Sequence, residues 1–168
     1  MRRTTLSLLT ALVLASSVAN AHDDFEYTRR NALLINVGDL FGGSLSLEYE
    51  RGVASWLGIN VGAGVAFFPS VWSPIDFTSG LNLDLGFRFH FIRHAPGGLW
   101  FGPYAMFGAG FDRDLYQWFM WGFGAGVGYN FVFGRHFTLQ LGAGGGFAAN
   151  GNHIVWAPRF RLGLGASW

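Results

Sequence analysis

The sequence predicts an all-β protein: a closed, up-and-down antiparallel barrel of eight strands that spans a membrane. The first observation is an alternation over residues 77–91, F-T-S-G-L-N-L-D-L-G-F-R-F-H-F, where every odd position except Ser79 is apolar. The even positions hold no large apolar residue and include Asp84 and Arg88. Because side chains alternate across a strand, one face is apolar and the other is polar or bare. A barrel in lipid accommodates both faces, apolar outside and polar inside.

Composition is the second observation. Hydrophobic residues make up 51% of the 168 residues, whereas charged residues make up 12%, about half of the usual share. After the N-terminal segment there is no run of roughly 18 apolar residues, as a membrane-spanning helix requires. High apolarity without such a helix favours a small transmembrane barrel in a single domain. The absence of cysteine excludes disulfides and thiolate metal sites.

The third observation is the turn residues that separate the predicted strands. The alternation predicts eight strands, at 32–38, 44–50, 57–67, 77–91, 99–111, 118–133, 137–148 and 154–168. Gly, Pro, Asp and Asn lie between them, including Arg51-Gly52 between the second and third strands. Eight is an even number and the smallest usual for bacterial barrels.

Two prolines fit this pattern poorly. Pro103 and Pro158 fall inside the fifth and eighth predicted strands. A closed barrel has no free edge where a missing N–H is harmless. We therefore expect a β-bulge at these prolines, or a position above or below the membrane where a ladder bond is dispensable.

The first 21 residues predict a cleaved signal peptide. Arg2 and Arg3 precede an apolar stretch over 6–18, and Ala19-Asn20-Ala21 forms the cleavage site. Residues 22–31 are then a polar periplasmic lead-in, and 32–168 form the barrel. Cleavage leaves nine Arg against ten Asp and Glu, and no basic patch suggests nucleic acid.

The end of the chain carries the most specific family signal. Its outward residues alternate up to a terminal aromatic: Phe160, Leu162, Leu164, Ala166 and Trp168. Together with the strand count, this resembles the small eight-stranded outer-membrane barrels, the group that includes OmpX, OmpW and the membrane domain of OmpA. The resemblance implies the outer membrane of a Gram-negative bacterium, with both chain ends in the periplasm. It also implies that Phe160, Leu162, Leu164 and Trp168 are a signal for the barrel-assembly machinery, with Trp where Phe is usual.

Inward charges predict an ion-pair network in the lumen. Three acidic and three basic residues face inward by the alternation: Glu48, Glu50, Asp84, Arg88, Arg159 and Arg161. The glycine-rich third strand leaves room for Arg88 to reach Glu48 or Glu50 across it. Paired charges tolerate burial, so one interpretation is a permanent plug. The other is a gate in a narrow pore.

An enzymatic site is the least favoured interpretation. A hydrolytic site needs a nucleophile beside a base. Lipid A deacylases with this architecture carry His-x-Ser on one strand, and none of the five His here is followed two residues later by Ser. We therefore expect no enzyme activity, no cofactor and no metal site. A lipid-modifying enzyme is the third and least favoured alternative for the function.

The segment 67–77, F-F-P-S-V-W-S-P-I-D-F, is an apolar connection. Phe68 and Trp72 are expected either to anchor at the lipid interface or to contact a hydrophobic solute or partner. The sequence therefore predicts a non-enzymatic outer-membrane protein with a structural or surface-interaction role. Its expected partners are membrane lipid and the assembly machinery. The main alternative is a narrow pore or conduit for small or hydrophobic solutes.

Overall fold

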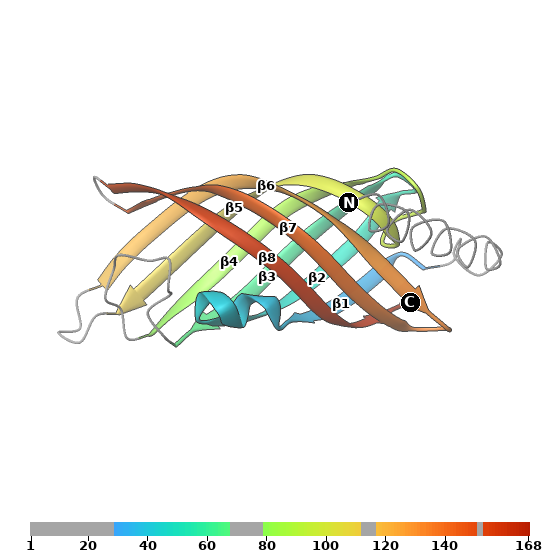
Figure 1. Cartoon of the computed structure of the whole chain (residues 1–168), viewed down its shortest axis with the longest axis horizontal. Coiled ribbons are helices and arrows are strands. Elements are labelled where there is room, and N and C mark those ends of the chain that lie inside the picture. Colours follow the sequence, from blue (N-terminus) through green and yellow to red (C-terminus); the bar gives the residue numbers. More distant parts are fainter. Residues whose placement is uncertain (1–28, 68–78, 112–116, 151–152) are drawn as a thin grey trace, which may run out of the picture.

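The computed structural model describes residues 29–67, 79–111, 117–150 and 153–168. Eight antiparallel strands form a closed barrel in chain order, so the predicted fold class is confirmed (Figure 1). The strands are β1 (Asn31–Asn36), β2 (Ser44–Ala54), β3 (Leu57–Ala66), β4 (Ser79–His90), β5 (Gly98–Phe111), β6 (Gln117–Phe133), β7 (Phe137–Asn150) and β8 (His153–Ser167). Among the described residues, no helix is both long and apolar enough to cross a membrane.

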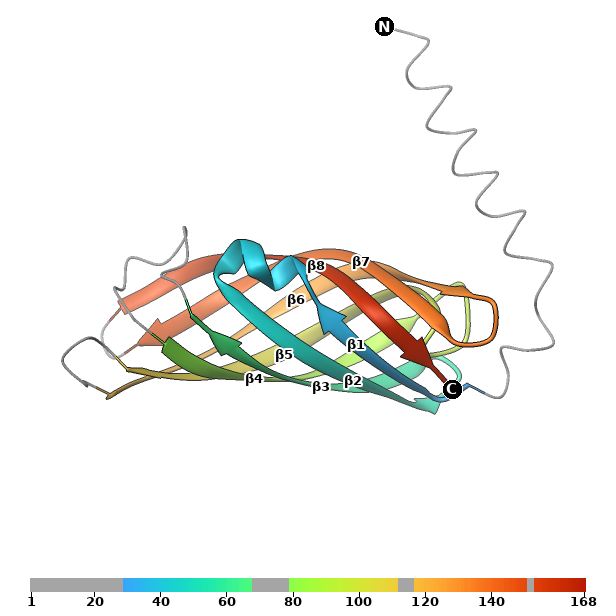
Figure 2. The same cartoon turned by 90° about the horizontal axis from the view of Figure 1, so that it is seen from below.

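The two ends of the barrel differ in their connections. Asn31 and Trp168 lie side by side at one end, where their backbones exchange hydrogen bonds of 2.9 Å. The turns β2–β3, β4–β5 and β6–β7 lie at the same end, which we call the terminal end. At the other end, which we call the distal end, β3, β5 and β7 end and β4, β6 and β8 begin (Figure 2).

The alternation in β4 is confirmed. Leu81, Leu83 and Phe87 are exposed on the outer face, whereas Asp84 and Arg88 are buried inside. The other strands also expose large apolar side chains outward, with Phe123 60% and Ile154 73% exposed. Because the period-2 geometry is a property of the single strand, it can be deduced before any strand pairing is known.

Several predicted boundaries differ from the observed ones by one or two residues, and the end of β2 differs by four. Strand β2 passes through Arg51 and Gly52, which pair with Ile59 and Gly58 of β3, so the turn lies beyond Ala54. The first strand ends at Asn36 rather than at residue 38. A 3₁₀ helix, η2 (Gly38–Gly42), follows it and was not predicted.

The position of η2 has a steric reason. Gly38 packs so closely on β8 that a Cβ there would lie 2.6 Å from the amide nitrogen of Leu162 and 2.9 Å from the carbonyl oxygen of Phe160. The helix ends at Gly43, whose φ of 76° is left-handed and suits glycine. This turn leads the chain back into β2, and it places Asp39 in the interior with 8% exposure.

The prolines are accommodated without a bulge. Pairing between β4 and β5 skips the residues opposite Pro103, yet Gly86↔Tyr104 and Phe89↔Phe101 share one register. The ladder is therefore interrupted, not shifted.

Pro158 lies on an edge that the sequence did not reveal. Strand β1 pairs with β8 only from Gly163 to Ser167. Leu162 accepts a 2.8 Å bond from Val37 on the β1 side, whereas Ser167 donates to His136 on the β7 side. The backbone N–H and C=O groups of successive residues point to alternate sides of an antiparallel strand. In β8, those of even-numbered residues therefore point toward β1. The missing N–H of Pro158 therefore faces beyond the end of β1, where it interrupts no ladder.

Candidate functional site

The lumen near the terminal end holds a buried group of charged side chains. Arg88 reaches from β4 across the glycine-rich β3, as predicted, to both acids of β2. Its Nη2 lies 2.5 Å from Glu48 Oε1 and its Nη1 lies 2.7 Å from Glu50 Oε2. A Cβ at Gly58 would collide with the Glu50 carboxylate, so the bare β3 residue makes this approach feasible.

Arg161 completes the pairing of Glu48 from the other side of the lumen. Its Nη1 forms an ion pair with Glu48 Oε2. Gln140 of β7 donates to the second oxygen, Oε1, at 3.3 Å. Residues from β2, β7 and β8 therefore meet on one carboxylate, although Glu48 and Arg161 lie far apart in the sequence.

His90, an inward residue of the same alternation in β4, joins this buried group. Its Nε2 lies 2.8 Å from Glu50 Oε1, and its Nδ1 lies 2.7 Å from the carbonyl oxygen of Gly97. Both ring nitrogens therefore lie within hydrogen-bond distance of an oxygen atom. We call Glu48, Glu50, Arg88, His90 and Arg161 the central cluster.

The remaining predicted charges, Asp84 and Arg159, form a separate distal cluster with Asp39, which was not predicted. Arg159 Nη2 forms an ion pair with Asp84 and lies 3.6 Å from Asp39 Oδ2. The Arg159 side chain is 15% exposed, more than any member of the central cluster. All six predicted lumen residues are thus ion-paired, but in two clusters instead of one network. The predicted three-against-three count becomes four acids against three Arg.

An aromatic and amide layer fills the lumen beside the central cluster. Trp100 of β5 is 2% exposed, and the Arg88 Cζ lies 4.2 Å from its ring centroid, a cation–π distance. The Trp100 Nε1 donates to Asn130 Oδ1 at 3.0 Å. Gln140 donates to the same oxygen at 3.1 Å. Because β5, β6 and β7 contribute these side chains, the layer reaches across the barrel interior. The sequence alternation marks Trp100 as inward but does not identify its partners.

A cavity of about 160 Å³ lies on the distal side of this layer. Residues of η2, β2, β4, β5, β6 and β8 line it, among them Asp39, Asn82, Asp84, Tyr104 and Arg159. The Asn82 Oδ1 has no hydrogen-bond partner among the described residues. The distal cluster therefore borders open space, unlike the central cluster.

The side chains of the two lumen clusters are arranged for ion pairing rather than for catalysis or metal binding. In the described ranges, no group of three or more His, Asp or Glu could hold a metal ion. His90, the histidine within the lumen, has both ring nitrogens engaged by acceptors, so it is not paired with a nucleophile. In the central cluster, the carboxylates of Glu48 and Glu50 are paired with Arg88 and Arg161 inside the lumen.

The predicted assembly signal lies along β8. Phe160, Leu164 and Trp168 are exposed on the outer face, and Leu162 is half-buried there. Trp168 also closes the barrel, because its backbone pairs with Asn31 at 2.9 Å. Phe68 and Trp72, the predicted interfacial residues, lie outside the described residues.

Comparisons with protein-family models and with curated proteins found no match to this chain.

Proposed function

We propose that this chain is an outer-membrane protein of a Gram-negative bacterium, exported by its signal peptide. In this proposal it is non-enzymatic and serves a structural or surface-interaction role, with its lumen plugged by the central cluster. The observation that carries the proposal is the combination of an apolar outer face with a polar, buried interior.

The outer face supports a lipid environment. Large apolar side chains on different strands are half exposed or more, for example Leu47 at 52%, Phe87 at 50% and Phe160 at 57%. Soluble monomers rarely expose contiguous apolar surface beyond a few hundred Å². The barrel leaves no strand edge unpaired near its terminal end, which suits a medium without hydrogen-bond partners.

The interior supports a plug. The five members of the central cluster are at most 6% exposed. Every carboxylate oxygen of Glu48 and Glu50 has an Arg, His or Gln partner. Ions crossing the lumen would have to displace these pairs together, which is unfavourable because each released charge would be buried without a partner.

A narrow pore or a conduit for hydrophobic solutes is the second candidate. The distal cavity and the edge of β8 beyond β1 favour it, because both provide space on the distal side of the central cluster. In that case the central cluster would act as a gate rather than as a plug.

Conductance in planar bilayers distinguishes these candidates. We expect refolded wild type to insert with heat-modifiable migration and to conduct little. Arg88→Ala and Arg161→Ala should conduct more, because each opens the central cluster, whereas Arg159→Ala in the distal cluster should resemble wild type. A large, steady wild-type conductance would contradict the plug and support the pore. Failure of the folded protein to insert would contradict the membrane assignment.

A further inference from the structure

The charges of the described residues are divided sharply between the lumen and the terminal end. All four carboxylate side chains in the described ranges lie in the lumen: Asp39, Glu48, Glu50 and Asp84. Five of the eight described arginines lie at the terminal end: Arg29, Arg30, Arg51, Arg93 and Arg135. His94 and His136 lie in the turns of the same end. Within the described residues, this end therefore carries basic side chains without any Asp or Glu.

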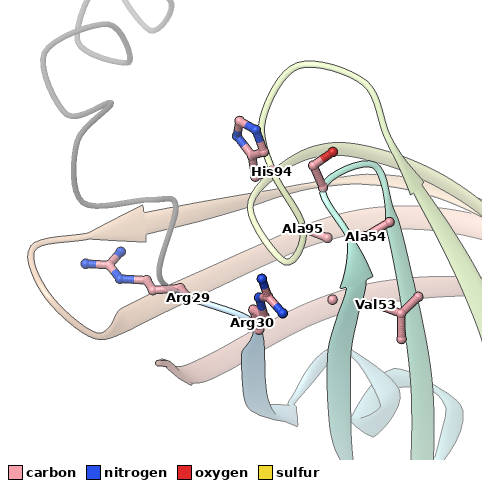
Figure 3. A pocket seen from close by; sticks show the side chains of 8 residues that line it. Arg29, Arg30, Val53, Ala54, His94 and Ala95 are labelled. Atoms are coloured by element: carbon pink, nitrogen blue, oxygen red, sulfur yellow. The ribbon is translucent and has the colours of Figure 1, made fainter.

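Three of these basic residues line one pocket of about 190 Å³ (Figure 3). Its walls are the segment that carries Arg29 and Arg30, the end of β2 with the β2–β3 turn, and the β4–β5 turn that carries His94. Figure 3 shows the Arg30 guanidinium directed into the space between its own segment and Ala95 of the β4–β5 turn.

Backbone hydrogen bonds hold these walls together. The Gly52 N–H donates to the Arg30 carbonyl oxygen at 2.7 Å, and the Ala95 N–H donates to the Ser55 carbonyl oxygen at 2.8 Å. The pocket is therefore built by strand pairing and turns, and its shape does not depend on a ligand.

The lining side chains favour an anion with several oxygens. A guanidinium has five N–H donors and no acceptor, and Ser55 adds a hydroxyl. Arg29 donates from Nη2 to the Gly134 carbonyl oxygen at 2.7 Å, and Figure 3 shows its guanidinium turned away from Arg30, so Arg30 is the main donor of the pocket. Arg30 forms no ion pair within the described ranges. Arginine matches phosphate oxygens particularly well because its planar fork can donate two parallel hydrogen bonds.

Apolar residues next to the pocket indicate where the phosphate comes from. Val53 lines the pocket and is 51% exposed, and Trp56 follows it in the turn with 54% exposure. Trp56 stacks on Phe89 of the outer face, with ring centroids 6.0 Å apart. A phosphate in the pocket would therefore be adjacent to the apolar outer face, where acyl chains would lie if the barrel spans a membrane.

We infer that this pocket binds the headgroup phosphate of an anionic phospholipid in the leaflet at the terminal end. The inference rests on the proposed membrane location. The sequence also provides a competitor, because Asp23, Asp24 and Glu26 shortly precede Arg29. The test must separate lipid from these acids and from free phosphate.

The experiment is native mass spectrometry of the mature chain, refolded in micelles, with dioleoyl phosphatidylglycerol or dioleoyl phosphatidylcholine. We expect phosphatidylglycerol adducts on wild type to exceed those of phosphatidylcholine about tenfold, as charge-assisted hydrogen bonds allow. Arg30→Gln should remove most of this preference. Arg135→Gln is the matched control, since it removes one charge at the same end outside the pocket, and it should behave like wild type.

Several outcomes would overturn the inference. Equal losses in Arg30→Gln and Arg135→Gln would show that diffuse charge, not the pocket, attracts the lipid. Arg30-dependent binding of inorganic phosphate, with no gain from phosphatidylglycerol, would assign the site to free phosphate. Binding that appears only when Asp23, Asp24 and Glu26 are neutralised would mean that the chain fills its own pocket.

Insertion into vesicles keeps this test separate from the proposed function. A protein that inserts but shows no preference for phosphatidylglycerol overturns the inference and leaves the proposed function standing. A protein that binds phosphatidylglycerol through Arg30 but does not insert contradicts the proposed function alone.

Discussion

The two halves of the barrel hold the same kind of ion pair in different surroundings. Toward the terminal end, β1 closes the wall between β2 and β8, and the central cluster is at most 6% exposed. Toward the distal end, β8 continues beyond β1, a cavity opens, and Arg159 is 15% exposed. Arg–carboxylate pairs are therefore buried more completely where β1 closes the wall than where β8 continues beyond it.

The difference originates in the length of the first strand. β1 has 6 residues, whereas β6 has 17. After Asn36 the chain leaves the wall and forms η2, which packs on β8 at Phe160 and Leu162. The distal part of the wall is therefore made by fewer strands than the terminal part.

The largest effect is expected at the strand that closes the terminal half. Deleting Trp168, or Trp168→Asp, should leave export intact but prevent insertion, because both changes remove the terminal aromatic and the deletion also removes the backbone pairing with Asn31. Outer-membrane fractionation and heat-modifiable migration measure this. Ile154→Asn, at the distal end of the same strand, is the control and should still insert. Normal surface abundance of the Trp168 variants would refute the prediction.

The two clusters should differ in stability when one arginine is removed. Arg88→Ala should lower the free energy of unfolding by about 3–5 kcal/mol, because Glu48 and Glu50 each lose a buried partner. Arg159→Ala should lower it by about 1–2 kcal/mol, because water can enter the adjoining cavity and solvate the freed Asp84 carboxylate. Urea unfolding of the refolded barrel, followed by tryptophan fluorescence, measures both. Equal losses would remove the distinction between the halves.

Packing around Trp100 offers a sharper test within one strand. Gly128→Ala would place its Cβ 2.5 Å from the Leu141 carbonyl oxygen and 2.6 Å from the Trp100 ring, so we expect a loss of about 1–3 kcal/mol from overpacking. Gly126→Ala is the matched control on the same face of β6, because its Cβ would lie 3.5 Å from that ring, an ordinary contact. The same urea titration compares them. If both variants lose equal stability, Trp100 is not the close neighbour that decides the effect.

The smallest effect is expected at the open edge of β8. Pro158→Ala should change the free energy of unfolding by less than about 0.5 kcal/mol, because the restored N–H faces beyond the end of β1. Ala157→Pro, one residue earlier, removes an N–H that faces β7 and should lower it by about 3 kcal/mol. A large gain from Pro158→Ala would show that this edge is paired.

Prediction from the sequence succeeded for features that depend on a single strand, such as the direction of its side chains. The alternation in β4 correctly placed Asp84 and Arg88 inside and Leu81 and Phe87 outside. It failed at residues 37–43, because η2 depends on the contact between Gly38 and β8, which is distant in the sequence. The alternation also placed His90 in the lumen, but its contacts with Glu50 and the Gly97 carbonyl oxygen could not be predicted, because they join residues of different segments.

The sequence by itself determined the eight strands, the two faces of each strand and the residues that point into the lumen. These follow from local geometry, since successive side chains of any strand alternate in direction. Only the tertiary structure decided that Glu48 meets both Arg88 and Arg161, that the charges form two clusters, and that five arginines gather at the terminal end. Those arrangements depend on strand register and on where β1 stops, because closing the barrel brings together residues that no local pattern connects.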